Sequence, residues 1–95
     1  MISVVATCFV KEDKIELFLK LSKELVMETQ KEPGCIEYNL YSNEKAPREF
    51  TYIEKWESKE NLDAHMISKH FKRIGLQMSG TLEKETSMYI YNEVF

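Results

Sequence analysis

The stretch Phe50-Thr51-Tyr52-Ile53-Glu54-Lys55-Trp56-Glu57-Ser58 shows the fold class more clearly than any other part of the chain. Every second position carries a large side chain, in the set Phe50, Tyr52, Glu54 and Trp56. Because successive side chains of a strand point to opposite faces, this alternation predicts a strand over Phe50–Glu57 with one bulky face. Ser58 is a favourable N-cap residue, so a helix is expected to follow the strand directly.

A second strand is predicted just before this one, over Cys35–Tyr41. Its apolar face would hold Ile36, Tyr38 and Leu40. The polar stretch Ser42–Glu49 is interpreted as a connection between the two strands. They should therefore form a hairpin.

The remaining segments alternate between the strand and helix periods. Ile2–Val10 is rich in β-branched residues and predicts a strand, and Thr86–Phe95 predicts another. Apolar residues at helical spacing predict a helix over Asp13–Lys31. Asp13 and Glu16 fit a capping box at its start, and Pro33-Gly34 ends it.

After Ser58, helical spacing continues to Gly80 in two pieces, the second starting near Ser68. The expected order is therefore βαββαβ in a single domain, 1–95. This is an α+β, ferredoxin-like arrangement in which both helical regions cover one face of an antiparallel sheet. The first strand should lie between the third and fourth. The apolar residues on the other face need a cover, and a second copy of the chain is the simplest one.

Composition excludes several classes of protein. The chain has 95 residues and a net charge of −3, with 13 Lys and Arg scattered among 16 Asp and Glu, so nucleic acid is not an expected partner. The apolar start lacks a basic region, which indicates a strand rather than a signal peptide, and no segment predicts a membrane span. Cys8 and Cys35 lie in separate apolar segments and are expected to be free thiols of a cytoplasmic protein.

Three motifs then occur in order along the chain. They are the Gly-containing turn and strand Glu32-Pro33-Gly34-Cys35-Ile36-Glu37-Tyr38, the strand end Glu54-Lys55-Trp56-Glu57-Ser58, and the segment His65-Met66-Ile67-Ser68-Lys69-His70-Phe71. In this order and spacing the sequence resembles the antibiotic biosynthesis monooxygenase family over essentially its whole length. The resemblance implies a dimeric α+β barrel with a pocket in each subunit between the sheet and the helices.

Members of that family include cofactor-independent oxygenases of hydroxylated aromatics and quinols, isomerases of a small signalling sugar phosphate, and haem-degrading enzymes. The haem branch is similar in outline but requires a histidine, an asparagine and a tryptophan at set places. Those places here hold Gly75, Ala6 or Thr7, and His65. Haem degradation is therefore not expected, although a shared fold cannot select the activity.

The two histidines of the sequence, His65 and His70, both lie in the segment expected to border the pocket. Imidazole titrates near neutrality, so either residue could take a proton from a phenol or quinol. The alternative is that each histidine lies on a helix surface or caps a helix. A spacing of five on a continuous helix turns the two rings apart, although a kink near Ser68 could change this. Even then, no third ligand with zinc spacing is evident, so no metal site is expected.

Glu54 stands out because it is a carboxylate between two aromatic residues of one strand face. Such a group must be hydrogen-bonded or have a raised pKa, as site residues do, or else pair with a cation at the sheet edge. The side chains expected to line the substrate pocket or to pack in the core are Trp56, Tyr38, Tyr52, Phe50 and Phe71.

The leading hypothesis is a cofactor-free monooxygenase in which His70 or His65, assisted by Glu54, deprotonates a small hydroxylated aromatic or quinol that then reacts with O₂. One alternative is an isomerase-type proton transfer on a small oxygenated metabolite. The other is a non-catalytic homodimer that binds a small molecule.

Overall fold

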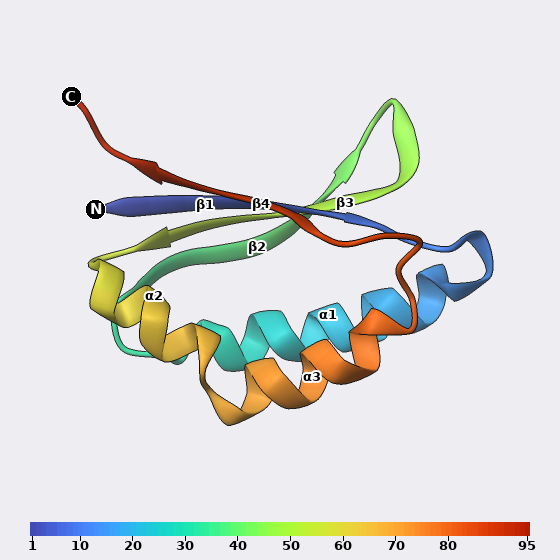
Figure 1. The fold of residues 1–95 in the computed structure, drawn as a ribbon, viewed down its shortest axis with the longest axis horizontal. Helices are drawn as coiled ribbons and strands as arrows, with labels where there is room; N and C mark the ends of the chain where they lie inside the picture. Colours follow the sequence, from blue (N-terminus) through green and yellow to red (C-terminus); the bar gives the residue numbers. More distant parts are fainter.

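The computed structural model describes residues 1–95 and shows a four-stranded antiparallel sheet with helices on one face (Figure 1). The elements are β1 (Ile2–Phe9), α1 (Ile15–Thr29), β2 (Cys35–Asn43), β3 (Ala46–Trp56), α2 (Lys59–Met66), α3 (Lys69–Ser79) and β4 (Ser87–Asn92). The strand order is β2-β3-β1-β4. Both the α+β ferredoxin-like class and the central position of the first strand are confirmed.

The bulky face of β3 builds the core beneath the sheet. Phe50, Tyr52, Glu54 and Trp56 all point toward the helices and are at most 8% exposed. Phe50 packs against Phe18 of α1, with ring centroids 5.3 Å apart. The alternation in the sequence therefore identified the inner face of this strand correctly.

The predicted connection Ser42–Glu49 is wrong in its extent. Pairing of β2 with β3 continues to Asn43 and resumes at Ala46, so Glu44 and Lys45 alone form the turn. The Asn43 side chain makes this possible, because its oxygen accepts the Lys45 backbone N–H at 2.9 Å while its amide donates to Glu49. The polar residues of this segment show no hydrophobic alternation, but backbone hydrogen bonds between strands do not depend on it.

Ile36 also departs from prediction, since it is 43% exposed rather than buried beside Tyr38. The register shifts between Cys35 and Glu37, where β2 carries a bulge. In a bulge, two residues of one strand lie opposite a single residue of its partner. The extra residue, here Ile36, therefore does not follow the inward and outward alternation of the strand. Cys35 is therefore the inward residue at this end of β2, opposite Trp56.

Two predicted ends are corrected as well. A 3₁₀ turn, Glu12–Lys14, precedes α1, and no side chain caps the helix, so Asp13 and Glu16 form no capping box. Asp13 lies inside the turn and not at the extended position that a cap requires. The last strand ends at Asn92 because its partner β1 begins at the opposite residue, Ile2.

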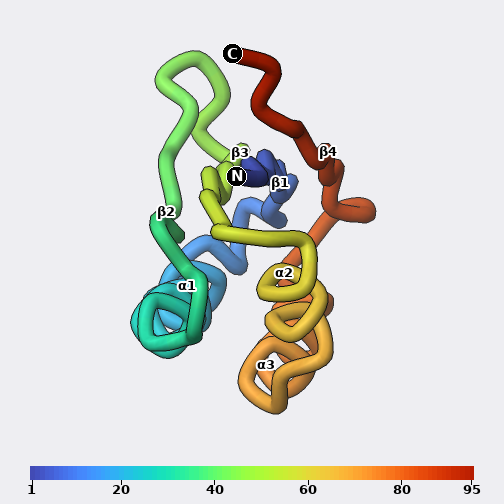
Figure 2. The backbone as a smooth tube through the Cα atoms, turned by 90° about the vertical axis from the view of Figure 1, so that its left-hand side faces the viewer, coloured from blue at the N-terminus to red at the C-terminus, as the bar shows by residue number.

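The two helical pieces after Ser58 are confirmed. The Ser58 hydroxyl accepts the Asn61 N–H at the start of α2, and the Ser68 hydroxyl accepts the Phe71 N–H at the start of α3. Seen along the sheet, α1 covers one half of its face, and α2 with α3 covers the other (Figure 2). No helix is long and apolar enough to cross a membrane.

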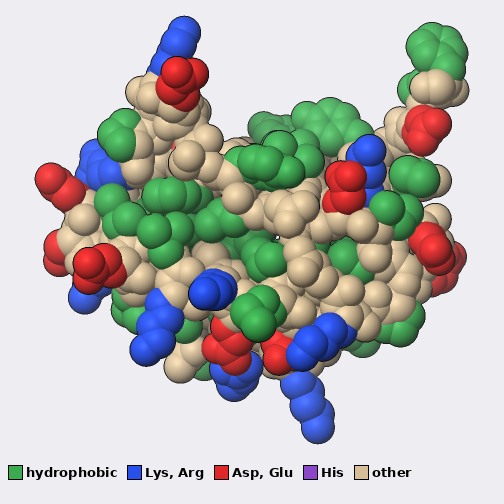
Figure 3. All heavy atoms as spheres, turned by 180° about the vertical axis from the view of Figure 1, so that it is seen from behind, with side chains coloured by type: hydrophobic (Ala, Val, Ile, Leu, Met, Phe, Trp, Pro, Cys, Tyr) green, Lys and Arg blue, Asp and Glu red, His purple; other side chains and the backbone are tan.

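The opposite face of the sheet carries no helix (Figure 2). Its exposed large side chains are Tyr41, Ile53, Tyr89 and Tyr91. A separate apolar area lies between α1 and β2, visible from behind as a patch of apolar side chains across the middle of the molecule (Figure 3). It includes Leu19 and Met27 of α1.

Candidate active site

A cavity of about 360 Å³ lies between the inner face of the sheet and the helices α2 and α3. Its wall is mostly apolar, and the few polar groups come from facing elements. The sheet contributes Tyr38, Tyr52 and Glu54, and the helices contribute His65 and Phe71. Small-molecule sites in proteins commonly combine a concave apolar wall with a few placed polar groups.

Five of the eight predicted site residues line this cavity, namely His65, Glu54, Tyr38, Tyr52 and Phe71. The other three, His70, Trp56 and Phe50, do not. Trp56 is fully buried behind the wall, and Phe50 lies in the core against α1. The structure thus brings one of the two histidines, and not both, to the cavity.

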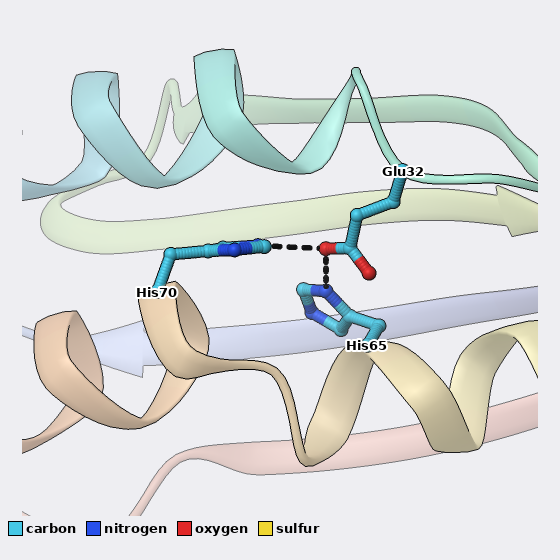
Figure 4. Close-up of side chains that lie close together, drawn as sticks. All are labelled: Glu32, His65 and His70. Carbon is cyan, nitrogen blue, oxygen red and sulfur yellow. Dashed lines mark hydrogen bonds and ion pairs between the residues drawn. The ribbon is translucent and has the colours of Figure 1, made fainter.

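The two imidazoles meet at a carboxylate that the sequence did not indicate, Glu32 (Figure 4). Its Oε2 lies 2.7 Å from His65 Nδ1 and 2.7 Å from His70 Nε2. The ring centroids of His65 and His70 are 6.1 Å apart. The break in the helix at Ser68 makes this convergence possible, since a continuous helix would turn residues five apart to different sides.

The turn after α1 positions Glu32. Its N–H donates to Thr29 O at 2.9 Å, and its carbonyl accepts the Cys35 N–H at 3.2 Å. Gly34 follows with φ +78°, and its carbonyl accepts the Glu57 N–H at 2.9 Å, which ties the turn to the end of β3. The Glu-Pro-Gly sequence therefore places a carboxylate beside the break between α2 and α3.

One ring nitrogen of His65 is held by Glu32, and the other has no protein partner. A carboxylate only accepts hydrogen bonds, so His65 Nδ1 donates to Glu32, and in the neutral ring the lone pair is on Nε2. No protein group hydrogen-bonds Nε2. Burial lowers the pKa of His65, although the hydrogen bond and charge of Glu32 oppose this shift. His65 is therefore a neutral base at physiological pH, with one nitrogen held and one available.

Glu54 supplies the second titratable group of the cavity. Its Oε1 accepts the Trp56 Nε1–H at 2.9 Å, and the side chain is 5% exposed. Burial raises the pKa of Glu54 to about 7; the Trp56 hydrogen bond lowers it, and the charge of Glu32 raises it further. Near neutral pH this carboxyl can thus either donate or accept a proton. It pairs with no cation at the sheet edge.

The two tyrosines of the wall differ in their hydrogen bonding. Tyr52 donates its hydroxyl to Ser22 Oγ at 2.7 Å, which fixes it against α1. The Tyr38 hydroxyl makes no hydrogen bond to protein although the residue is only 1% exposed. Burial raises the pKa of Tyr38 well above its ordinary value, so its hydroxyl stays protonated and can donate to a ligand.

Glu32, His65 and His70 are also the three residues whose donor atoms could hold a metal ion, since these atoms all lie within 4.8 Å of one another. Both nitrogens are aimed at the carboxylate oxygen itself, at hydrogen-bonding distance. A cation would have to displace that oxygen from the point where the nitrogens converge. The observed geometry is that of a hydrogen-bonded cluster.

The chain matches the family model described as "Antibiotic biosynthesis monooxygenase" over residues 1–75. It is 33% identical over 82 residues to the uncharacterized protein sll1783 of Synechocystis, a match that covers 86% of this chain. The same match covers 56% of that relative, so this chain spans little more than half of its length.

Solved structures agree over nearly the whole chain. A conserved protein from Methanosarcina mazei Go1 is 42% identical, with a TM-score of 0.95 over 97% of this chain and 91% of its own. A crystal structure described as an antibiotic biosynthesis monooxygenase is 32% identical, with a TM-score of 0.94 over 99% of both chains. The chain belongs to the antibiotic biosynthesis monooxygenase family.

Proposed function

We propose that this protein is a cofactor-independent monooxygenase of a small hydroxylated aromatic or quinol, which binds in the cavity between the sheet and helices α2 and α3. The observation that carries this proposal is His65, which lines an apolar cavity of about 360 Å³ while its Nδ1 is held by Glu32 at 2.7 Å. The ring therefore offers Nε2 to a substrate hydroxyl.

In the first step, Nε2 of His65 takes the proton of the substrate hydroxyl, leaving an electron-rich anion. The anion passes one electron to O₂, and the resulting radical and superoxide combine at a ring carbon. The peroxide anion takes the proton back from His65. The hydroperoxide then loses water, formed from its terminal OH and the hydrogen on the same carbon, and a carbonyl remains.

The other groups of the cavity bind the substrate and exclude water. Tyr38 and the second carboxyl oxygen of Glu54 have no protein partner in the cavity wall, so they suit oxygens of the substrate. Tyr52 and Phe71 provide apolar surface for a flat ring. Trp56 acts behind the wall by holding Glu54.

The proposal extends to the state and location of the protein. The uncovered sheet face, with Ile53 and Tyr89 exposed, suits pairing with a second copy about a twofold axis. Cys8 and Cys35 are free thiols, as expected of a cytoplasmic protein.

The test is oxygen consumption with menadiol as the probe, measured against its uncatalysed autoxidation. Wild-type protein should exceed autoxidation, and His65→Gln should lose on the order of a hundredfold of the excess, because the amide cannot act as a base. Glu60→Gln, an exposed change on the same helix, is the control. No excess over autoxidation with menadiol and a panel of related quinols would contradict the proposal.

Isomerase-type proton transfer is the second candidate, because the neutral base His65 and the titratable acid Glu54 both line one cavity. Such a pair can remove a proton from one carbon of a metabolite and return one to another without oxygen. Turnover of an oxygenated metabolite that continues unchanged under strict anaerobiosis would favour this candidate over the first.

A further inference from the structure

The cluster of Glu32, His65 and His70 contains two groups for which the proposed reaction has no direct use. His70 is 20% exposed and does not line the cavity, so it cannot touch a substrate bound there. Glu32 does not line the cavity either, and its contact with the site is the hydrogen bond to His65 (Figure 4). Glu32 and His70 are nevertheless hydrogen-bonded to each other, between Oε2 and Nε2.

We propose that Glu32 and His70 are positioning residues that act on the substrate only through His65: Glu32 fixes the His65 ring with Nε2 toward the cavity, and His70 holds the Glu32 carboxylate from the solvent side. This assignment rests on the proposed function of His65 as the base. It also replaces the expectation that either histidine could serve as that base.

The geometry supports these roles because three separate elements converge on one oxygen. Glu32 comes from the turn after α1, His65 from the end of α2 and His70 from the start of α3. An ionised carboxylate accepts from both rings, so each nitrogen that faces it must carry its proton. The tautomer of His65 is thereby set, and with it the nitrogen that remains free for a substrate.

His70 is itself held in place. Its Nε2 lies 3.4 Å from Ser68 Oγ and 3.5 Å from Thr29 Oγ1, and Thr29 is fully buried. Because His70 lies at the first turn of α3, movement of that helix would pull the carboxylate away from His65. The cluster therefore couples the orientation of the base to the packing of α3 on α1.

In this arrangement a positive charge on His70 disfavours a positive charge on His65. The titratable groups that face His65 are Glu32 from the turn, His70 from α3, Tyr38 from β2 and Glu54 from β3. The carboxylate of Glu32 favours protonated His65, whereas a positive charge on His70 disfavours it.

The experiment is a ¹⁵N and ¹³C NMR titration of the two imidazoles in the full chain, which requires no substrate. Neutral His65 of the wild type should be the tautomer protonated on Nδ1. Glu32→Gln should lower the pKa of His65 and release its tautomer, whereas His70→Gln should raise the pKa of His65 and leave its tautomer fixed. Glu28→Gln removes a carboxylate four residues earlier, on a side chain that is 44% exposed, and should change neither the pKa nor the tautomer of His65.

The proposal would be overturned if Glu32→Gln and His70→Gln shifted the pKa of His65 in the same direction. It would also be overturned if neither shifted this pKa more than Glu28→Gln does. A neutral His65 of the wild type that carries its proton on Nε2 would also overturn the proposal. This tautomer can be measured even if a variant fails to fold. A stoichiometric shift of both rings on adding Zn²⁺ alone would instead identify a metal site and overturn the positioning roles.

A second measurement separates this inference from the proposed function. With menadiol, Glu32→Gln should lower kcat by at least about tenfold and change KM little, and His70→Gln should retain more activity than His70→Phe, since Gln can still donate to the carboxylate. If the NMR result holds but no oxygen is consumed, the positioning of His65 stands and the oxygenase assignment fails.

Discussion

A carboxyl group that is buried in an apolar wall carries a free-energy cost that depends on pH, and Glu54 is such a group. One of its oxygens is hydrogen-bonded by Trp56, but no cation lies beside it to favour the ionised form. Keeping such a group at the wall of a cavity lowers stability near neutrality, and this is typical of residues selected for activity.

Glu54→Gln should therefore stabilise the protein at high pH. Burial raises the folded-state pKa of Glu54 from 4.5 to about 7, so its stabilising effect is complete below pH 4.5 and is lost as pH rises through 7. The quantity to compare is the free energy of unfolding of the variant minus that of the wild type. This difference should be about 2 to 3 kcal/mol larger at pH 8 than at pH 4.5. Urea unfolding at the two pH values measures this, with Glu57→Gln, an exposed change three residues on, as the control.

The sequence allowed the placement of Glu54 to be predicted, because its neighbours in the strand are aromatic and strand alternation is local. It did not indicate Glu32, which lies 33 residues from His65 along the chain and meets it only after the sheet and helices have packed. The available signal was weak: a carboxylate directly before Pro33-Gly34, in a turn that the fold brings beside the second helical region.

Among the elements, the turn after α1 and the break between α2 and α3 position the cluster of Glu32, His65 and His70. Gly34 adopts a positive φ that other residues rarely tolerate, and a Cβ at this position would collide with the Asn61 side chain near the start of α2. The turn that carries Glu32 is therefore packed directly against the helix that carries His65.

Gly34→Ala should destabilise the protein by about 2 kcal/mol, through backbone strain and the collision together. It should also reduce activity with menadiol by displacing Glu32. Gly75→Ala is the matched control for stability only, because Gly75 lines the cavity; a Cβ there meets nothing within 4 Å, and α3 should gain roughly 0.5–1 kcal/mol from the better helix former. Thermal unfolding of the two variants would contradict this reasoning if Gly34→Ala were as stable as Gly75→Ala.

The elements themselves were largely predictable, because helix and strand periods are properties of neighbouring residues. The errors lie where tertiary pairing extends or interrupts a pattern. Backbone hydrogen bonds lengthened the hairpin through the polar residues up to Asn43, and the bulge beside Cys35 moved Ile36 to the surface. Neither effect leaves a signature in hydrophobic spacing.

At the scale of the whole molecule, the sheet is covered on one face only. A chain of this size buries a limited fraction of its surface, and exposed aromatic side chains such as Tyr89 and Tyr91 favour association. A twofold dimer through this face would cover both sheets at once and leave the cavities on the far side of each.

We propose a dimer through this face, so Ile53→Glu should give a monomer, since it places a charge on the uncovered face. Light scattering after size exclusion should give twice the 11.3 kDa chain mass for the wild type and the single mass for the variant. Met27→Glu, on the other apolar area, should remain dimeric. A monomeric Met27→Glu with a dimeric Ile53→Glu would place the interface between α1 and β2 instead.

The central claim, that substrate binds between the sheet and α2 with α3 against His65, is tested most directly by a crystal structure after an anaerobic soak with menadiol. The account predicts the ring inside the cavity, with one oxygen within about 3 Å of His65 Nε2 and the other near Glu54 or Tyr38. A ring bound elsewhere, with the cavity empty and His65 Nε2 without a partner, would contradict it.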